Sequence, residues 1–489
     1  MEPTNGRPHV VIVGGGISGL AAAFFLRDEA VRVTVLEGSP RLGGKLSVSE
    51  IAGTAVDEGA EALLVTRPEG TALIAEAGLA DQRANPGPTS SAIWTLGALR
   101  PLPRRQFMGV PSDMTELSRS GVLSDEGVAR AREDLELRPT TRDGDVSVAG
   151  YVGARLGGEV VDRLVDPLLG GVYAGRSAEL SFDATLPALA AASRRHASLA
   201  EAARSLLPPQ AGSPGTRAGG PVFTTLTGGL GMLPDYLAKL SGAEVRTGAV
   251  ARELAPAGRG WRLTVGSAAA PRQVEADAVI LAVPARPAGR LLAGVPGASA
   301  AVTAFGQISY ASMAIVTLAY PRSAFPAPGL AGLGWSGYLV PAVDGRAVKA
   351  VTFSTVKWPH LAGASADADL EIVRCSVGRI GEEALLQHAD DELAALAAAE
   401  LAAATGVRSG PVATRVTRWG GALPQYTVGH LDRVAAIRSA VAAQPGLAVC
   451  GAAYDGVGVP ACVATARAAA GQVLTFLAGG PVGDARAVR

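Results

Sequence analysis

Three glycines near the N-terminus have the spacing of a site that binds a dinucleotide. Gly14, Gly16 and Gly19 form the pattern G-x-G-x-x-G. The first glycine permits a tight turn, the second lets the backbone approach a pyrophosphate, and the third lets a helix lie close to the preceding strand. The N–H groups at the helix N-terminus, within 14–19, would face the phosphates. The alternative is a glycine-rich turn that only packs.

An acidic residue follows at the distance that such a site requires. Glu37 lies about 20 residues beyond the glycines, where a carboxylate accepts hydrogen bonds from ribose hydroxyls. The same carboxylate would repel a 2′-phosphate. The spacing therefore favours a dinucleotide without that phosphate.

The elements that must position these residues can also be read from the sequence. Residues 10–13 are a β-branched run, residues 20–26 form a small apolar helix, and residues 31–36 form a second strand that ends at Glu37. Strand, glycines, helix, strand and acid thus occur in the order of a Rossmann unit.

Two further glycine-containing segments follow the acid. Arg41, Gly43 and Gly44 form R-x-G-G, and adjacent glycines remove side chains where backbone presses against a bulky ligand. Arg41 can face a diphosphate, although the segment also fits a plain Pro/Gly turn. Residues 56–62 (V-D-E-G-A-E-A) come next, and Lys45 lies between the two segments.

The composition excludes several classes of protein. The chain has 489 residues, a hydrophobic content of 48% and a net charge of zero, which gives no sign of a nucleic-acid partner. Its three cysteines and five histidines have no disulfide or metal-ligand spacing, so we expect no metal site. No apolar run reaches the roughly 18 residues of a spanning helix, and no signal peptide is evident, so we expect a cytoplasmic protein without an integral membrane segment.

The order of predicted strands indicates an interrupted domain. Residues 276–284 form a strand that ends at a proline, and residues 447–462 again run from a strand into glycines, before a helix over 463–477. We expect an α/β fold in which residues 1–90, 222–295 and 410–489 build one Rossmann-type domain. Residues 91–109 and 296–409 would form an inserted mixed-sheet substrate domain, and 110–221 a helical subdomain.

Several motifs resemble one enzyme family. R-x-G-G and D-E-G-A resemble markers of the FAD-dependent amine oxidase and porphyrinogen oxidase superfamily. Residues 166–175 (D-P-L-L-G-G-V-Y-A-G) resemble a signature of the protoporphyrinogen/coproporphyrinogen III oxidases. Residues 353–360, 373–379 and 418–426 are similar to other segments of the same family, in the same order.

The resemblance implies an FAD enzyme of haem biosynthesis with an amine-oxidase-like fold. It would oxidise coproporphyrinogen III to coproporphyrin III by six electrons, with hydride transfer to flavin N5, dioxygen as acceptor and hydrogen peroxide as product. The lack of membrane and targeting segments points to the bacterial, coproporphyrin-forming branch, with protoporphyrinogen IX as the alternative substrate. A flavin amine oxidase, a carotenoid desaturase and a flavin-binding protein without turnover fit less well. Transient contacts with neighbouring haem-pathway enzymes also follow from the resemblance.

Site residues can be carried over from the family one by one. The helix N-terminus at 456–460 suits the negative charge that reduction places on a flavin ring, and Trp419 would pack beside the ring unless it is a core residue. We find no His/Asp constellation, so no catalytic side chain is predicted, and catalysis would rest on positioning and on the flavin. The predicted FAD contacts are Gly14, Gly15, Gly16, Ile17, Ser18, Gly19, Glu37, Gly38, Arg41, Gly44, Lys45, Gly59, Ala60, Glu61, Ala62, Val250, Trp419, Ala452, Val457, Gly458 and Val459.

The substrate contacts are predicted from its chemistry. Propionates call for arginines at a pocket rim, and Arg67, Arg104 and Arg105 are the candidates, each with a solvated surface arginine as the alternative. Tyr338, Leu339 and Phe353 are candidates for the walls around the macrocycle, with core packing as the alternative.

Overall fold

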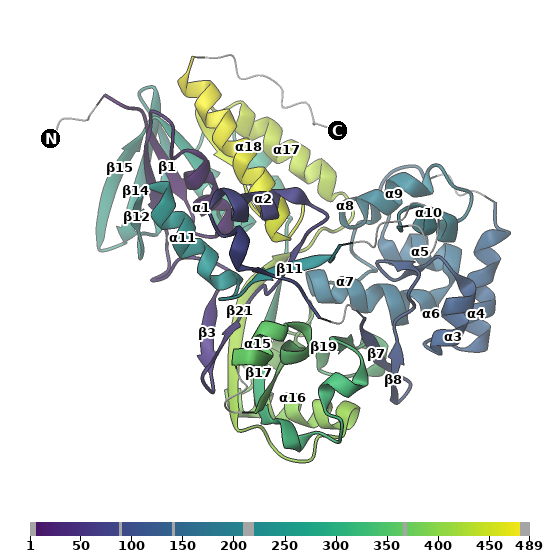
Figure 1. Cartoon of the computed structure of the whole chain (residues 1–489). Coiled ribbons are helices and arrows are strands. Elements are labelled where there is room, and N and C mark those ends of the chain that lie inside the picture. Colours follow the sequence, from purple (N-terminus) through teal and green to yellow (C-terminus); the bar gives the residue numbers. More distant parts are fainter. Residues whose placement is uncertain (1–5, 88–89, 139–141, 209–219, 365–368, 480–489) are drawn as a thin grey trace.

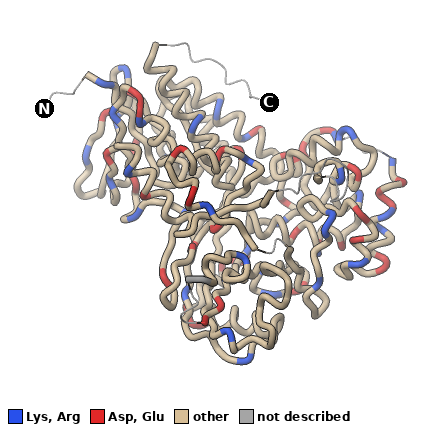
Figure 2. The backbone as a smooth tube through the Cα atoms, in the orientation of Figure 1, with Lys and Arg blue, Asp and Glu red and all other residues tan. Residues whose placement is uncertain are grey.

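The structure is a computed structural model that describes residues 6–87, 90–138, 142–208, 220–364 and 369–479. Three parts can be followed in Figure 1: a parallel sheet with its helices, a larger mixed sheet, and a group of helices beside both. Figure 2 shows acidic and basic residues interspersed along the chain rather than gathered by sign. Within the described residues, no helix has both the length and the apolar character needed to cross a membrane.

The parallel sheet is assembled from segments far apart in the sequence. Its strands are β12 (Glu244–Arg246), β2 (Arg32–Leu36), β1 (His9–Val13), β16 (Ala278–Leu281) and β22 (Leu447–Val449), in that order. All neighbouring pairs are parallel. Strands covered on both faces are typically continuous apolar runs, and β1 is buried throughout.

Alternate residues of β1 enter two different hydrophobic cores. Val10 and Ile12 pack with α1 (Ile17–Phe25), α2 (Pro68–Glu76), α11 (Leu233–Ser241) and α18 (Val459–Leu477). Val11 and Val13 belong to the core on the other face. That face is covered by α12 (Ala285–Leu292), α13 (Ser299–Gly306), α17 (His430–Ala442) and the small sheet of β13 (Ala251–Ala257), β14 (Gly260–Ser267) and β15 (Ala270–Ala276). The helix starts differ slightly from the sequence prediction: α1 begins at Ile17 and α18 at Val459.

The mixed sheet has the strand order β21-β17-β20-β19-β18-β7-β8. Its two longest strands, β17 (Tyr310–Pro321) and β21 (Ala413–Pro424), pair antiparallel and reach from the mixed sheet to the parallel sheet. The helix α16 (Asp390–Thr405) covers one face. The other strands are β20 (Leu370–Val377), β19 (Val348–Phe353), β18 (Gly337–Leu339), β7 (Ala92–Thr95) and β8 (Ala98–Pro101).

The helical part lies between residues 114 and 205 and has its own core. A near-continuous helical stretch runs through α5 (Val148–Leu156), α6 (Gly158–Val160), a π-helical turn (Val161–Val165) and α7 (Asp166–Tyr173). The remaining helices are α3 (Met114–Ser120), α4 (Asp125–Arg132), α8 (Phe182–Thr185), α9 (Pro187–Ser193) and α10 (Leu199–Ser205). The boundaries of the three domains stay predictions.

Candidate functional site

A cavity of about 980 Å³ lies where the two sheets and α7 meet. Its floor is formed at the carboxyl ends of β1, β2 and β16, by Val13, Leu36 and the segment 282–284. Ligands of open α/β sheets bind at this end of the strands, and the volume lies in the range of cofactor and substrate pockets.

Most residues predicted to hold the cofactor line this cavity. They come from the glycine turn, from the segments that follow β2 and β4 (Thr54–Asp57), from the start of α18, and singly from the segment before β13, from β21 and from the segment after β22. The lining includes Gly14, Gly16, Ile17, Ser18, Glu37, Gly38, Gly44, Lys45, Gly59, Ala60, Glu61, Ala62, Val250, Trp419, Ala452, Val457, Gly458 and Val459.

The glycine turn leaves room on its cavity side. At Gly14, φ is +113°, and an added Cβ would lie 2.4 Å from the carbonyl oxygen of Ala282, so glycine is required by the fold itself. At Gly16, the nearest atom to an added Cβ is the Cα of Gly44, at 4.0 Å. The absence of a side chain at Gly16 is therefore not needed for packing and is explained by a ligand that approaches the backbone.

Two helix N-termini point at the same cavity. The first residues of α1 and of α18 both line it, and neither helix has an acidic residue in its first turn or a side-chain hydrogen bond at its N-cap, Gly16 or Gly458. Free N–H groups and the positive dipole end favour negative charge. A diphosphate at α1 and an electron-rich ring edge at α18 fit this arrangement.

Gly15 and Gly19, which were predicted as cofactor contacts, support the turn from behind. The N–H of Gly15 donates to the carboxylate of Glu37 at 2.7 Å. An added Cβ at Gly19 would lie 1.9 Å from the carbonyl oxygen of Gly14, so a side chain there would push α1 away from β1. Glu37 also accepts from the N–H of Ser39 at 2.7 Å, so its carboxylate organises the loop as well as facing the cavity.

Arg41 lies outside the cavity wall. Its guanidinium donates to the carbonyl oxygens of Gly44 at 2.7 Å and Leu42 at 3.0 Å. It also lies over the ring of Trp419, 5.5 Å from the ring centroid. Trp419 itself lines the cavity and donates from Nε1 to the carbonyl oxygen of Glu58 at 2.9 Å. Arg41 thus holds the R-x-G-G loop and Trp419 in place, and its contact with a diphosphate stays a prediction.

Glu61 joins the loop wall of the cavity to the mixed sheet. Its carboxylate accepts from Lys357 Nζ at 2.6 Å and forms an ion pair with Arg374, whose second nitrogen donates to the carbonyl oxygen of Gly59 at 2.6 Å. Burial alone would raise the pKa of Glu61, but the two cations outweigh it and lower the pKa to about 2. Glu61 is therefore ionised at neutral pH.

Sequence reasoning missed the partners of Glu61. Lys357 and Arg374 lie in two of the segments that carried the family resemblance, yet nothing in the sequence indicated which carboxylate they meet. A third cation, the half-buried Lys45, lines the cavity near Cys462, and desolvation lowers its pKa. The cavity therefore has cations on the R-x-G-G side and on the mixed-sheet side.

The mixed sheet offers one face to the cavity through alternate residues. Met313 and Ile315 of β17, Ala350 and Thr352 of β19, and Arg374 and Ser376 of β20 all line it. Side chains two residues apart lie on the same face of a strand, so the residues between them point to the core beneath α16. The remaining wall on this side is apolar and consists of Leu63, Leu64, Gly171, Val172, Phe223, Ala422 and Leu423.

The residues predicted to form the macrocycle walls fall mostly on the other face. Tyr338 and Phe353 are 3% and 0% exposed in the core under α16, with ring centroids 6.0 Å apart. The structure thus shows both residues in core packing, which was the alternative. Each lies one position along its strand from a residue on the sheet face that turns to the cavity, so its side chain points to the opposite face. Leu339 has the opposite phase, and its Cδ2 lies 3.6 Å from an added Cβ at Gly171.

None of the three predicted arginines lines the cavity within the described part of the chain. Arg104 is exposed, and Arg105 donates to the carbonyl oxygen of Pro208 at 3.0 Å. Arg67 lies nearer, since its Nη1 is 3.3 Å from an added Cβ at Gly456, two residues before Gly458. Their contacts with substrate stay predictions.

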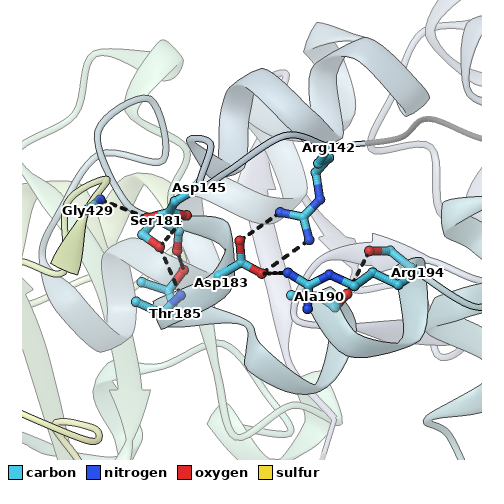
Figure 3. A network of polar contacts seen from close by, with 10 residues as sticks. Arg142, Asp145, Ser181, Asp183, Thr185, Ala190, Arg194 and Gly429 are labelled. Carbon is cyan, nitrogen blue, oxygen red and sulfur yellow. Dashed lines mark hydrogen bonds and ion pairs between the residues drawn. The ribbon is translucent and has the colours of Figure 1, made fainter. Parts of the chain in front are cut away.

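A polar network anchors the helical part to the segment that leads into the cavity. Figure 3 shows Asp183 between Arg142 and Arg194, and Asp145 between Ser181 and Gly429. Next to this network, the hydroxyl of Tyr426 donates to the carbonyl oxygen of Ala452 at 2.6 Å and accepts from the N–H of Gly456 at 2.8 Å. The Ala452 loop is thus held through Tyr426.

Comparisons with known proteins agree on one family. The model of the flavin-containing amine oxidoreductases matches residues 17–474. Coproporphyrinogen III oxidase of Mycobacterium tuberculosis is 40% identical over 95% of this chain and 97% of its own length. Protoporphyrinogen oxidase of Macaca fascicularis is 30% identical, with 95% and 98% covered.

A solved structure from Exiguobacterium sp. 255-15, whose name assigns it provisionally to the protoporphyrinogen oxidases, has a TM-score of 0.82 and 30% identity. It covers 95% of this chain and 98% of its own. The predicted fold class, a Rossmann-type sheet with an inserted mixed-sheet part, is confirmed by this likeness and by the sheets described above. The comparisons also support a flavin as the cofactor, which fits the glycine turn and the two helix N-termini.

Proposed function

This chain belongs to the flavin-containing amine oxidoreductase family and, within it, to the porphyrinogen oxidases, and on that premise we propose that it oxidises coproporphyrinogen III to coproporphyrin III. One observation carries the proposal. The cavity that is lined by the glycine turn is also lined by the apolar residues Val172, Phe223, Ile315 and Leu423, which offer a surface for an apolar macrocycle beside the cofactor.

We propose FAD as the flavin. FAD has a diphosphate and a ribose, and the turn at Gly16 and the carboxylate of Glu37 are placed to bind these two groups, which FMN does not combine. Bound there, the flavin supplies the oxidant that takes hydride from the substrate and passes the electrons to dioxygen.

The chain's own residues act by binding and by excluding water. Gly14, the segment 16–18 and Glu37 would hold the nucleotide, while Gly59 to Ala62, Trp419 and Val457 to Val459 would hold the ring. Arg374 and Lys357 keep Glu61 ionised, which fixes the loop at Gly59 and Ala60 against the mixed sheet. Arg67, Arg104 and Arg105 are proposed for the propionates from the rim.

The direct test is anaerobic mixing of the purified protein with each porphyrinogen while the visible absorbance of the flavin is followed. We expect faster bleaching with coproporphyrinogen III than with protoporphyrinogen IX. After oxygen is admitted, turnover should give a higher kcat/KM for coproporphyrinogen III and one hydrogen peroxide per two electrons. No bleaching with either substrate would contradict the proposal. Faster bleaching by protoporphyrinogen IX would favour the second candidate, whose support is the similar enzyme of Macaca fascicularis.

The cofactor has its own test. The purified protein should be yellow, and acid denaturation should release the flavin as FAD. Finding FMN, NAD or a covalent adduct would contradict the assignment of the cofactor and leave the family unchanged.

A further inference from the structure

A second, much smaller cavity of about 20 Å³ lies behind the wall that holds Glu61. We refer to it as the polar cavity. It shares Glu61 and Arg374 with the large cavity and is otherwise lined from β4, from the segment before α11, and from α14 (Ser354–Lys357) and α15 (Pro359–Ala364). The residues whose polar groups bear on the argument are Asp57, Glu61, Ser354, Trp358, His360 and Arg374.

Four of these side chains carry a buried polar atom that has no hydrogen-bond partner among the described residues. The atoms are Ser354 Oγ, Trp358 Nε1, His360 Nδ1 and Arg374 Nε. Ser354, Trp358 and Arg374 are 1%, 2% and 7% exposed. Buried polar groups in native proteins are almost always paired, with protein or with ordered water, so four around one small cavity indicate a bound polar molecule.

The chemistry of the four atoms defines that molecule. The Nε1 of Trp358 and the Nε of Arg374 can only donate, so the molecule must accept at least two hydrogen bonds. The carboxylates of Asp57 and Glu61 beside it disfavour an anion and provide acceptors for a donor. A water molecule accepts two hydrogen bonds and donates two, and about 20 Å³ suffices for one water.

The polar cavity also lies between the large cavity and the protein surface. On one side it meets Glu61 and Arg374, which line both cavities. On the other side it is lined by Ala55, which is exposed, and by His360 and Leu361, which are half-buried. A water at this place would lie between the two sides, beside Asp57 and His360, the lining side chains that can take up a proton.

We propose that the polar cavity binds one ordered water, and that this water and Asp57 pass protons between the large cavity and solvent. Asp57 accepts from the N–H groups of Leu230 at 2.9 Å and Gly231 at 2.8 Å, which fix its carboxylate beside the water. Substituting Asp57, substituting the side chains that donate to the water, or filling the polar cavity should therefore each slow proton transfer between the large cavity and solvent.

The charges that face Asp57 suit proton exchange near neutral pH. Burial raises the pKa of Asp57 to about 6, against the lowering effect of the two backbone N–H groups and of Arg374, while Glu61 raises it slightly. Burial lowers the pKa of His360, which lines the cavity from α15. Lys357 is paired with Glu61, and the neighbouring Glu58 is bound to Ser49 and Thr417.

The use of this route rests on the proposed function. The three two-electron oxidations of a porphyrinogen together remove four hydrogens from meso carbons and two from pyrrole nitrogens, three as hydride equivalents and three as protons. In each step a meso C–H bond breaks and a proton leaves a pyrrole nitrogen, and a final tautomerisation moves the last surplus meso proton to a nitrogen. The hydride equivalent goes to the bound flavin oxidant, the N–H electron pair stays on nitrogen, and the remaining proton has to leave the site. The route takes this proton through the water to Asp57 and on to solvent.

The water is tested without substrate, by comparing two buried tryptophans. Trp261 is 2% exposed, like Trp358, but its Nε1 donates to the carbonyl oxygen of Pro445 at 2.9 Å. If the water is present, Trp358→Phe should lower the Tm of the holoenzyme about as much as Trp261→Phe, and Ser354→Ala should also lower it. If the polar cavity is dry, both changes there remove an unpaired group, and Tm should stay the same or rise. A crystal structure should show the water within hydrogen-bond distance of Trp358 Nε1 and Arg374 Nε, and a cavity without density would overturn the proposal.

The proton route is tested by timing. In a weakly buffered anaerobic mixture with coproporphyrinogen III, a pH-indicator dye reports proton release while the flavin absorbance reports electron transfer. We expect both signals together in the unmodified enzyme and a proton signal delayed by about tenfold or more in Asp57→Asn. Because Asn cannot accept from both backbone N–H groups, Ser354→Ala repeats the test in a milder variant. Simultaneous signals in all three proteins would overturn the route, whereas no bleaching in the unmodified enzyme would contradict the proposed function and leave the water test valid.

Discussion

One wall of the large cavity is made of backbone, and the opposite wall is made of side chains. On the first wall, Gly14, Gly16 and Gly44 bring main chain to the surface, and two helix N-termini supply the charge. On the second wall, alternate residues of β17, β19 and β20 supply the surface. The difference shows that a ligand held by backbone is encoded over a few consecutive residues, whereas a ligand held by a sheet face depends on the register of strands far apart in the sequence.

The largest expected effect comes from a substitution in the backbone wall. Gly16→Val should abolish FAD binding without unfolding the protein, because the nearest protein atom to an added Cβ is 4.0 Å away and the side chain would occupy the ligand's space. The flavin-to-protein ratio from absorbance, with circular dichroism for folding, measures this. Gly471→Val, at an exposed position of α18 with nothing within 4 Å of an added Cβ, is the control that should keep the flavin. A folded Gly16→Val protein with one flavin per chain would contradict the assignment of the backbone wall to the cofactor.

The next effect concerns the contact between the two walls. Glu61→Gln should destabilise the protein by about 3 kcal/mol, because it leaves Lys357 and Arg374 with an uncompensated charge in a mostly buried place. Urea unfolding followed by circular dichroism measures the change. Glu116→Gln, in the exposed pair with Arg119, should change the free energy of unfolding by less than about 1 kcal/mol. Equal effects of the two substitutions would mean that Glu61 does not hold the walls together.

A pH dependence of stability is expected from Asp57, which lines the polar cavity together with Glu61 and Arg374. The pKa of Asp57 is about 6 in the folded protein and about 4 when unfolded, so the folded state binds more protons between these values. Its contribution to stability therefore falls as pH rises from 4 to 6, by roughly 2–3 kcal/mol, and stays low above 6. The difference in free energy of unfolding between the unmodified protein and Asp57→Asn, measured by urea titration at several pH values, should follow this curve. A difference that does not change with pH would show that Asp57 has an ordinary pKa.

The smallest effect is expected at the rim of the side-chain wall. Neutralising Arg104 and Arg105 together should raise KM for coproporphyrinogen III more than for protoporphyrinogen IX, because the former carries two more propionates. Arg104 is exposed and neither residue lines the cavity, so we expect no more than about fivefold, and less at higher salt. Steady-state kinetics with both substrates measures it. Equal changes for both would mean that these arginines do not distinguish the propionates.

The two walls were predictable from sequence to different extents. The residues around Gly14 to Gly19 and Glu37 could be placed on one cavity because each segment follows a strand of the same parallel sheet, whereas Gly59 was placed there by the family resemblance of its segment. The sequence did not show that Arg41 binds carbonyl groups of its own loop, since a contact with a ligand would need the same residue at the same place.

On the mixed sheet, the prediction depended on the phase of each strand. Residues 348–353 (V-K-A-V-T-F) contain apolar residues on both faces, so the pattern does not show that Thr352, and not the predicted Phe353, faces the cavity. Arg374 and Cys375 also point to opposite faces of their strand. That Arg374 pairs with Glu61 follows only from the structure, in which β20 lies beside β19 and the Arg374 guanidinium lies beside the Glu61 carboxylate.

The strand order of the parallel sheet has a consequence for how the protein is made. β1 begins at His9, its neighbour β16 begins at Ala278, and the outer strand β22 ends at Val449. At the roughly 5–20 residues per second of protein synthesis, roughly 20–90 s pass between the synthesis of the first of these strands and the last. During that time the apolar residues of β1 have no complete core, and the glycine turn has no partner helix α18. The first part of the cofactor site is thus among the first segments to leave the ribosome, and the last part is among the last. A chain truncated before β22 should therefore fail to hold flavin and should aggregate.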